Sequence, residues 1–377
     1  MILSPRDIPS KNLQTIASDA INCGADILFD PQFYLPHADH KTLCEHSYWP
    51  KNYSTGAFFA GYGLSELLDE LGKLNSLLGS IGFILPGIHA STIDDAWLKY
   101  HKMIAEAAVD KGFRDGFKLF ATVALSAEAL VDDDQVHELL EEIESWPVDG
   151  IYLVCEHPKG EYLVSDTNWL VNQLDLSAGL RLQGKEVISG YSNHQSLILA
   201  TASVNAIASG TWMNVRSFPP EKFVIPPEEI VKTKSIWYYC PHALSEFKIT
   251  FLDVASRQGI LSEMMTPAAF GSSFADSLFV GVGRPSLVGL NERNSFLHYL
   301  QCLNVQTAQS RLSTFDATVD AYNQMLDSAE QFLSLLHDQG VRGQNRDFSE
   351  IIDVNRAAIA TLKSTRGPML KRKWGSL

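Results

Sequence analysis

Several short apolar runs in this sequence end in side chains that can do acid–base or binding chemistry. The first run ends in Asp30-Pro31-Gln32-Phe33-Tyr34, a carboxylate and an amide beside two aromatic rings. A carboxylate in this place can serve as a general acid or base, and an Asp before Pro can also simply begin a turn. Asp30 is therefore a candidate catalytic residue, with the turn as the alternative.

A second carboxylate follows a later apolar run in Cys155-Glu156-His157-Pro158. Glu156 leaves the run directly into the place where a pocket is expected, and its oxygens could accept hydrogen bonds from the Watson–Crick edge of a base. The alternative is a Glu paired with Lys159 or with a backbone amide. Glu156 is the second candidate for acid–base chemistry and a candidate for binding a base.

Two more runs end in small residues. The segment 189–194 reads Ser-Gly-Tyr-Ser-Asn-His, and the segment 208–216 runs from Ala-Ser-Gly into a bulky loop that carries Arg216. Gly190 and Gly210 would allow close approach of a ligand to the backbone, and Tyr191 offers a ring for stacking. These positions predict contacts with a planar ligand.

The elements that must position these residues are strands alternating with helices. Most of the runs are continuously apolar, which is typical of parallel strands buried on both faces, and no G-x-G-x-x-G motif follows the first strand. The pattern predicts an α/β fold, a (β/α)8 TIM-type barrel, whose functional residues lie at the carboxyl ends of the strands. The predicted strands are 26–29, 57–60, 82–85, 117–125, 150–154, 186–189, 204–208 and 235–239.

The pattern changes near Asn291, where apolar residues keep a helical spacing for forty residues. We therefore expect a barrel over residues 1–290 and a helical C-terminal extension over 291–377, packed on the barrel. A long final barrel helix is the alternative. The basic tail Lys371-Arg372-Lys373-Trp374 is expected to be a frayed terminus or a small contact patch.

Composition narrows the class of protein. With 30 basic and 44 acidic residues the net charge is −14, which disfavours the broad cationic surface that nucleic-acid binders need. The five cysteines are scattered without a C-x-x-C pair, and no apolar run is long enough to span a membrane. We expect a soluble, cytoplasmic protein that contacts no membrane.

Metal chemistry has weak support in the sequence. His37, Asp39, His40, Cys44 and His46 lie within ten residues, and Cys240 precedes His242 by two, but the spacing matches no structural zinc pattern. We expect no metal and no cofactor. A metal-dependent barrel that uses His37, His40 and His242 is the alternative.

The order of segments resembles the tRNA-guanine transglycosylase superfamily, which exchanges guanine for a 7-deazaguanine base on a modified (β/α)8 barrel. Residues 13–36 are similar to the family's opening strand and turn. Residues 185–216 are similar to its sixth strand, helix and seventh strand, and residues 293–348 resemble its C-terminal helical part. The resemblance covers most of the chain through soft motifs in the same order.

Departures from the family pattern fall at its chemical centre. Ser54 stands where the family carries its general acid/base aspartate, in a stretch that ends at Phe58, and Ala208 stands where it carries its nucleophilic aspartate. The family's zinc motif is absent, and Tyr299 takes the place of its histidine. The resemblance thus implies a remodelled fold for which tRNA is not an expected partner.

What the resemblance implies is recognition of a 7-deazaguanine-type base, or of a protein partner that carries it. Divergent relatives accompany a cGAS/DncV-like nucleotidyltransferase in type IV CBASS anti-phage operons, which makes such an enzyme the expected protein partner. The alternative is an active glycosylase or transferase of altered mechanism that uses Asp30 or Glu156. The predicted base-binding residues are Phe58, Glu156, Ser189, Gly190, Tyr191, Ser209 and Gly210.

Overall fold

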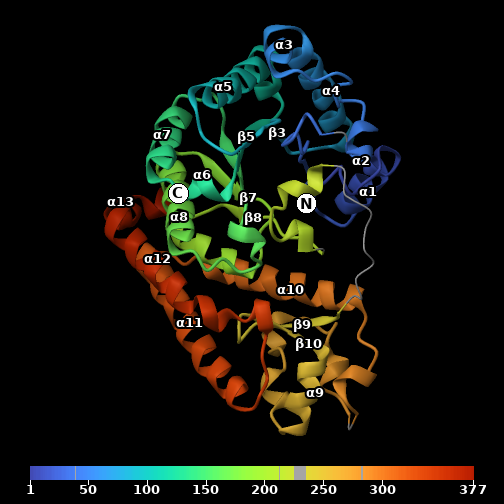
Figure 1. Ribbon diagram of the computed structural model, residues 1–377, viewed down its shortest axis with the longest axis vertical. Coiled ribbons are helices and arrows are strands. Elements are labelled where there is room, and N and C mark those ends of the chain that lie inside the picture. The colour runs from blue at the N-terminus through green and yellow to red at the C-terminus, as the bar shows by residue number, and fades with distance from the viewer. Residues whose placement is uncertain (39, 212, 225–234, 282) are drawn as a thin grey trace.

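The computed structural model describes residues 1–38, 40–211, 213–224, 235–281 and 283–377. Its central feature is a parallel sheet with the strand order β3-β5-β6-β7-β8, in which β4 also pairs with β5. The sheet is curled, with helices on its outer side (Figure 1). The strands are β3 (Gly82–Ile84), β4 (His89–Ala90), β5 (Lys118–Leu125), β6 (Gly150–Cys155), β7 (Glu186–Ser189) and β8 (Ala206–Ile207).

A short parallel pair continues this curve beyond β3. It consists of β1 (Ile2–Leu3) and β2 (Leu28–Phe29), and the amide of Ile81 donates to the carbonyl of Ile27 at 2.9 Å, which ties β2 to the start of β3. The α/β class and the parallel sheet are confirmed. The described residues form a curled half-barrel, and a closed eight-stranded barrel is not shown.

The two central strands explain why the apolar runs do not alternate. All of β6 and all of β5 except Lys118 are buried, because helices cover the outside of the sheet and aromatic side chains fill its inside. The covering helices are α1 (Ser10–Asn22), α4 (Gly63–Leu78), α5 (Asp95–Asp110), α6 (Ala127–Val131), α7 (Asp133–Glu144) and α8 (Thr167–Leu182).

Two of the predicted strands are different in the structure. Residues 57–60 belong to a helix, α3 (Thr55–Ala60), with α2 (Lys41–Cys44) before it. The run is too short for its apolar content to separate a strand from a helical turn. The last predicted strand lies in β9 (Trp237–Cys240), which forms an antiparallel hairpin with β10 (Ser245–Lys248) outside the parallel sheet.

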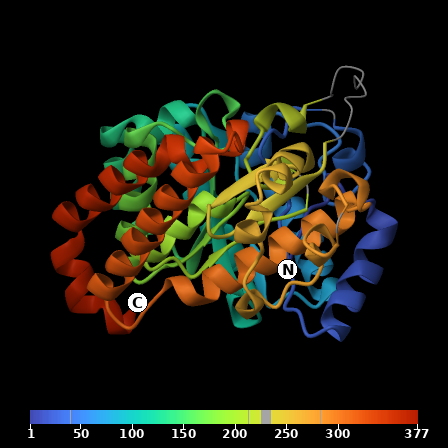
Figure 2. The same ribbon diagram turned by 90° about the horizontal axis from the view of Figure 1, so that it is seen from below.

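The C-terminal part of the chain is helical. It contains α10 (Glu292–Ser310), α11 (Phe315–Asp338), α12 (Ile352–Thr365) and α13 (Gly367–Lys373), and α9 (Ile249–Arg257) precedes them beside the hairpin. The view from below shows α11 and α12 side by side along one flank (Figure 2). Arg366 holds this part to α8 through a bidentate pair with Asp175, at 2.8 and 2.7 Å.

The basic tail is neither frayed nor a free patch. Trp374 is buried, its indole donates to the carbonyl of Leu312 at 2.9 Å, and the Arg311 guanidinium stacks on its ring. Lys371 pairs with Asp316 at 2.9 Å. The tail therefore packs against the helical part. Its tryptophan supplies the apolar surface for this packing, and the net charge of the tail gives no information about it.

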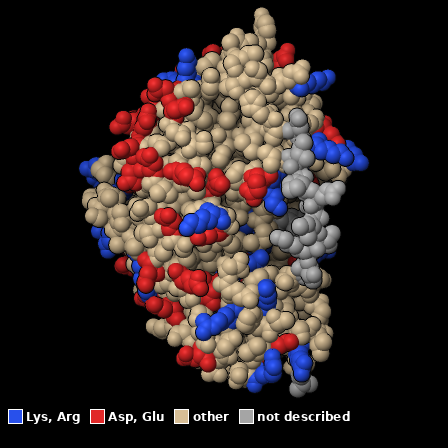
Figure 3. All heavy atoms as spheres, viewed as in Figure 1, with Lys and Arg blue, Asp and Glu red and all other residues tan. Residues whose placement is uncertain are grey.

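The described part of the chain contains no helix with the length and hydropathy of a membrane-spanning segment. The face shown in Figure 3 carries Asp and Glu along the edge formed by α5, α7 and α8, and no broad basic area lies among its described residues. The acidic side chains behind the negative net charge are thus exposed on this face.

Candidate functional site at the carboxyl ends of the strands

The residues singled out after the apolar runs do converge at one end of the half-barrel. Asp30 follows β2, Glu156 follows β6, Gly190 and Tyr191 follow β7, and Ser209 follows β8. Backbone hydrogen bonds continue the ladder past the strands, from the amide of Gly190 to Leu153 and from that of Glu156 to Leu125. Parallel strands end at the same edge, so their first loop residues become neighbours.

Asp30 lies at the bottom of this end and is 1% exposed. Its Oδ2 atom accepts a hydrogen bond from the hydroxyl of Tyr34 at 2.7 Å, and the hydroxyls of Tyr152 and Tyr191 lie at 3.3 and 3.5 Å. Its Oδ1 atom accepts from the backbone amide of Gln32 at 2.8 Å. We call Asp30 with these three tyrosines the tyrosine cage.

Electrostatics in the tyrosine cage are governed by burial. Loss of water raises the pKa of Asp30 to about 6, although the hydrogen bonds from the tyrosines and from Gln32 pull it down. Burial, reinforced by the nearby Asp30 charge, also raises the pKa of Tyr34, Tyr152 and Tyr191 well above the ordinary value. The tyrosines therefore remain neutral hydrogen-bond donors, and Asp30 is the group of the cage that titrates near neutrality.

Two residues beside the cage have strained backbone conformations. Gln32 and Tyr191 both have positive φ, 52° and 51°, a region that costs non-glycine residues of order 1 kcal/mol or more each. Their side chains hold each other, because the amide of Gln32 donates to the Tyr191 hydroxyl at 2.8 Å while its oxygen accepts from the backbone amide of Arg6 at 2.7 Å. Such strain persists where the surroundings fix the conformation.

An aromatic layer separates the cage from solvent. Phe218 and Phe223, 2% and 1% exposed, come from the segment after β8. The ring of Phe218 lies 4.9 Å from that of Tyr34 and 5.1 Å from that of Tyr191, both in edge-to-face contacts, and Phe223 lies 5.1 Å from Tyr34. In this conformation Asp30 has no path to a dissolved substrate.

Glu156 occupies a different place, above the aromatic layer. Its side chain is 28% exposed, and its Oε2 atom lies 3.4 Å from Nε2 of His89 at the start of β4. The backbone of Glu156 pairs with that of Phe218, which sets the carboxylate beside the ring that seals the cage. Neither Lys159 nor a backbone amide neutralises this carboxylate among the interactions of the described residues. Glu156 is thus a partly exposed carboxylate with the imidazole of His89 beside it.

The space above Glu156 is a pocket of about 320 Å³. Its volume falls within the range of small-molecule sites. Acceptors and donors border it together with apolar rings, so it can hold a planar polar molecule. The lining residues are Glu156, His157, Gly160, Tyr162, Met213, Asn214, Ser217, Phe218, Pro219, Pro220, Glu221, Lys222 and Asn345.

No protein-family model matches this sequence, and no curated protein matches it. The chemistry of the site therefore has to be judged from its own geometry.

The predicted close-approach glycines serve the protein's own packing. A Cβ on Gly190 would come within 2.6 Å of the Tyr152 hydroxyl, and a Cβ on Gly210 within 2.3 Å of a methyl of Val215. The glycines thus make room for the buried ring of Tyr152 and the partly buried side chain of Val215. Sequence alone shows that space is needed at these positions and not which atoms fill it.

Replacing Gly190 by Ala is expected to displace Tyr152 and to lower the free energy of unfolding by about 1–3 kcal/mol, the usual cost of overpacking a core. The matched control is Gly56→Ala, because a Cβ at that position meets no atom within 4 Å. Urea unfolding of both variants checks this. Equal stability of Gly190→Ala and wild type would contradict the assigned packing.

The other predicted base contacts are scattered. Phe58, which belongs to α3, packs on Phe33 and Tyr53. The rings around Tyr191 are those of Tyr34, Phe218 and Phe223. Phe58 and Tyr191 therefore belong to separate aromatic groups and do not form one stacking site.

Of the two predicted serines, Ser189 at the end of β7 is buried and Ser209 after β8 is partly buried. The Ser189 hydroxyl accepts from Ser192 at 3.1 Å, and the Ser209 hydroxyl lies beside Tyr299. Of the predicted base-binding residues, Glu156 alone lines the pocket above the strand ends.

A buried ion cluster, which the sequence reasoning missed, lies behind this pocket. Glu246 on β10, 3% exposed, binds Arg216 at 3.3 Å and Arg346 at 2.9 Å through the same oxygen. The Arg216 guanidinium stacks on Tyr299 at 3.5 Å, and that of Arg346 on Trp237 at 3.9 Å. The cluster joins the loop after β8, the hairpin and the C-terminal part.

Metal ligands do not gather in the described part of the chain, where no group of three His, Cys, Asp or Glu side chains could hold an ion. Nε2 of His37 lies 3.3 Å from the Thr55 hydroxyl, and His242 contacts Phe332 in a different part of the molecule. Asp39 lies outside the described residues. The alternative built on His37, His40 and His242 is therefore wrong for the three histidines as a set.

Proposed function

We propose that the protein binds a 7-deazaguanine-type base, free or attached to a protein partner, in the pocket above Glu156. It would do so on a remodelled transglycosylase-like barrel of which the curled half-barrel is the described part. The observation that carries the proposal is the accessible Glu156 carboxylate at a parallel strand end, beside the Phe218 ring and inside a pocket of about 320 Å³.

The chemistry of the carboxylate selects the class of base. A guanine-type ring presents an N1–H and a 2-amino group side by side, and both are donors that one carboxylate can accept from. Adenine has no such pair of adjacent donors. Nε2 of His89 lies 3.4 Å from the carboxylate. The pocket therefore favours a guanine or 7-deazaguanine edge over an adenine edge.

Base exchange of the ordinary kind does not follow from this site. The places of the two family aspartates hold Ser54 and Ala208, and the buried carboxylate of Asp30 lies under the rings of Phe218 and Phe223. A general base must reach the proton that it removes. Asp30 is better described as a positioning residue for the tyrosine cage than as a catalyst, so we propose binding without transglycosylation.

For the partner, we propose a cGAS/DncV-like nucleotidyltransferase that presents the modified base. Loops around the pocket and the C-terminal part, which Arg346 joins to the hairpin, offer the protein surface beside the base. Co-purification of the two proteins with and without a 7-deazaguanine modification tests this step separately from binding of the free base.

The free-base step is tested by calorimetry with 7-cyano-7-deazaguanine, guanine and adenine. Wild type is expected to bind the first two and to bind adenine at least tenfold more weakly. Glu156→Gln is expected to weaken binding of the guanine-type bases by about 10- to 100-fold, the worth of a charge-assisted hydrogen bond of about 1.5–3 kcal/mol.

The matched control is Glu128→Gln, an exposed carboxylate on α6 outside the pocket, which should bind like wild type. Equal affinity of Glu156→Gln and wild type for 7-cyano-7-deazaguanine would overturn the role of Glu156. Absence of binding by a folded wild type would overturn the proposal for the free base.

A further inference from the structure

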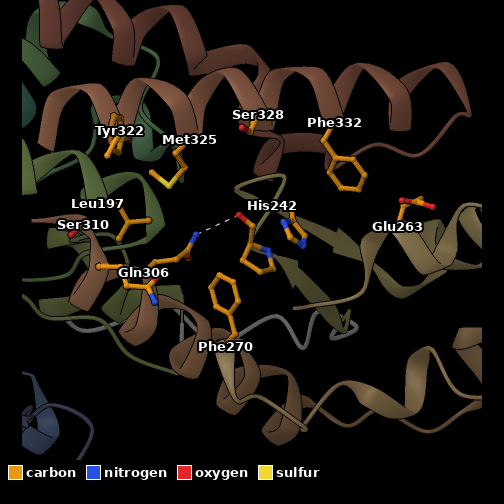
Figure 4. Close-up of a pocket in the computed structure, with 13 residues that line it drawn as sticks. Leu197, His242, Glu263, Phe270, Gln306, Ser310, Tyr322, Met325, Ser328 and Phe332 are labelled. Carbon is orange, nitrogen blue, oxygen red and sulfur yellow. Dashed lines mark hydrogen bonds between the residues drawn. The ribbon is translucent and has the colours of Figure 1, made fainter. Parts of the chain in front are cut away.

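A second pocket, of about 620 Å³, is lined by other residues than the strand-end pocket. It opens between α10 and α11 on one side and the β9–β10 turn with residues 263–270 on the other. Figure 4 shows Met325 and Phe332 on α11 facing Phe270 on the opposite wall, with His242 between Phe332 and Phe270 and Glu263 at one end.

The floor of this pocket contains polar side chains whose hydrogen-bond donors are paired within the protein. The Gln306 amide, 7% exposed, accepts from Tyr239 at 2.8 Å and donates to the carbonyl of Pro241 at 3.4 Å. The hydroxyl of Ser328 donates to the backbone of its own helix at 2.8 Å, and that of Tyr322 donates to Asn355 at 3.2 Å. Because these donors are already used within the protein, a ligand body gains mainly apolar and ring contacts there.

The charge at the rim of this pocket is negative. Glu263 is exposed and is the single charged side chain among the lining residues, which include no Lys or Arg. Partial desolvation lowers the pKa of His242 below its ordinary value, which favours the neutral imidazole at neutral pH. An anionic head group would find no cation among the lining residues, whereas an ammonium group would find the Glu263 carboxylate.

We infer that this pocket binds a small amphipathic amine, with its apolar body between α11 and Phe270 and its ammonium group at Glu263. The inference goes beyond the proposed function and does not depend on it, because no residue of this pocket lines the strand-end pocket.

Methionine-methyl NMR tests the inference on the full chain. Met325 lines the pocket, and Met103 on α5 lies outside it and serves as an internal reference. Protein labelled with ¹³C at the methionine methyl groups is titrated with 2-phenylethylamine, 2-phenylethanol and phenylacetate. Met325→Leu identifies the resonance.

The expected result is a saturable shift of the Met325 resonance with the amine, at least threefold weaker binding of the alcohol, and no shift with phenylacetate. Glu263→Gln should make the amine and the alcohol bind equally, and the exposed Glu350→Gln outside the pocket should behave like wild type. A Met325 resonance unmoved by the amine would overturn the inference. Phenylacetate binding as tightly as the amine, or an unchanged preference in Glu263→Gln, would do so as well.

Discussion

Replacing Glu246 by Gln is expected to lower the free energy of unfolding by about 3–5 kcal/mol, because it leaves two buried guanidinium groups without a counter-charge. Arg216 and Arg346 are 1% and 12% exposed in their side chains, and Glu246 binds both. Burial by itself would raise the pKa of Glu246, but the charges of Arg346 and Arg216 hold that pKa below the ordinary value. The carboxylate is therefore ionised in the folded protein.

The lowered pKa of Glu246 also determines how its contribution to the free energy of unfolding changes with pH. A carboxyl group with a lowered pKa in the folded state stabilises the protein above its unfolded pKa, and that stabilisation is lost as pH falls through the folded pKa. The difference between wild type and Glu246→Gln should therefore be full at neutral pH and shrink in acid.

Urea unfolding at pH 7 checks the magnitude. Glu70→Gln is the control, because its ion pair with Lys73 lies on the surface and is expected to contribute less than about 1 kcal/mol. A loss for Glu246→Gln no larger than that for Glu70→Gln would show that the cluster is not needed to hold the hairpin and the C-terminal part in place.

The second large effect is expected at Asp30, and its sign is opposite. The folded pKa of about 6 lies above the ordinary value of 3.8, so the folded state holds a proton that the unfolded chain has already released. The stabilisation associated with this proton is complete below the unfolded pKa and is lost as pH rises through about 6. Between pH 3.5 and 8 wild type should lose about 3 kcal/mol relative to Asp30→Asn, at 1.36 kcal/mol for each pKa unit.

The measurement is the unfolding free energy of wild type and Asp30→Asn at several pH values. Only the change in their difference with pH matters, which removes the constant effect of the amide in the cage. The exposed Asp19→Asn on α1 gives the control, with a difference from wild type that stays flat. A flat difference for Asp30→Asn would show that Asp30 is not held in a water-free site.

Some features of the site follow from sequence pattern and others do not. That Asp30, Glu156 and Tyr191 lie at one end of a parallel sheet follows from buried apolar runs, because parallel strands must end together. Phe218 and Phe223 had no such signal, since they lie in an irregular segment after the sheet. The aromatic and proline content of residues 218–223 is the one cue that such a segment packs inward.

The sequence by itself determined the α/β class, the parallel strands β3, β5, β6, β7 and β8 and the helices of the C-terminal part, because hydrophobic periodicity is a local property of the chain. The tertiary structure alone decided that residues 57–60 are helical, that Gly190 makes room for Tyr152, and that Asp30 is sealed while Glu156 is open. These outcomes depend on contacts between residues far apart in the chain. Whether a carboxylate meets water or a ring depends on which distant segment covers it.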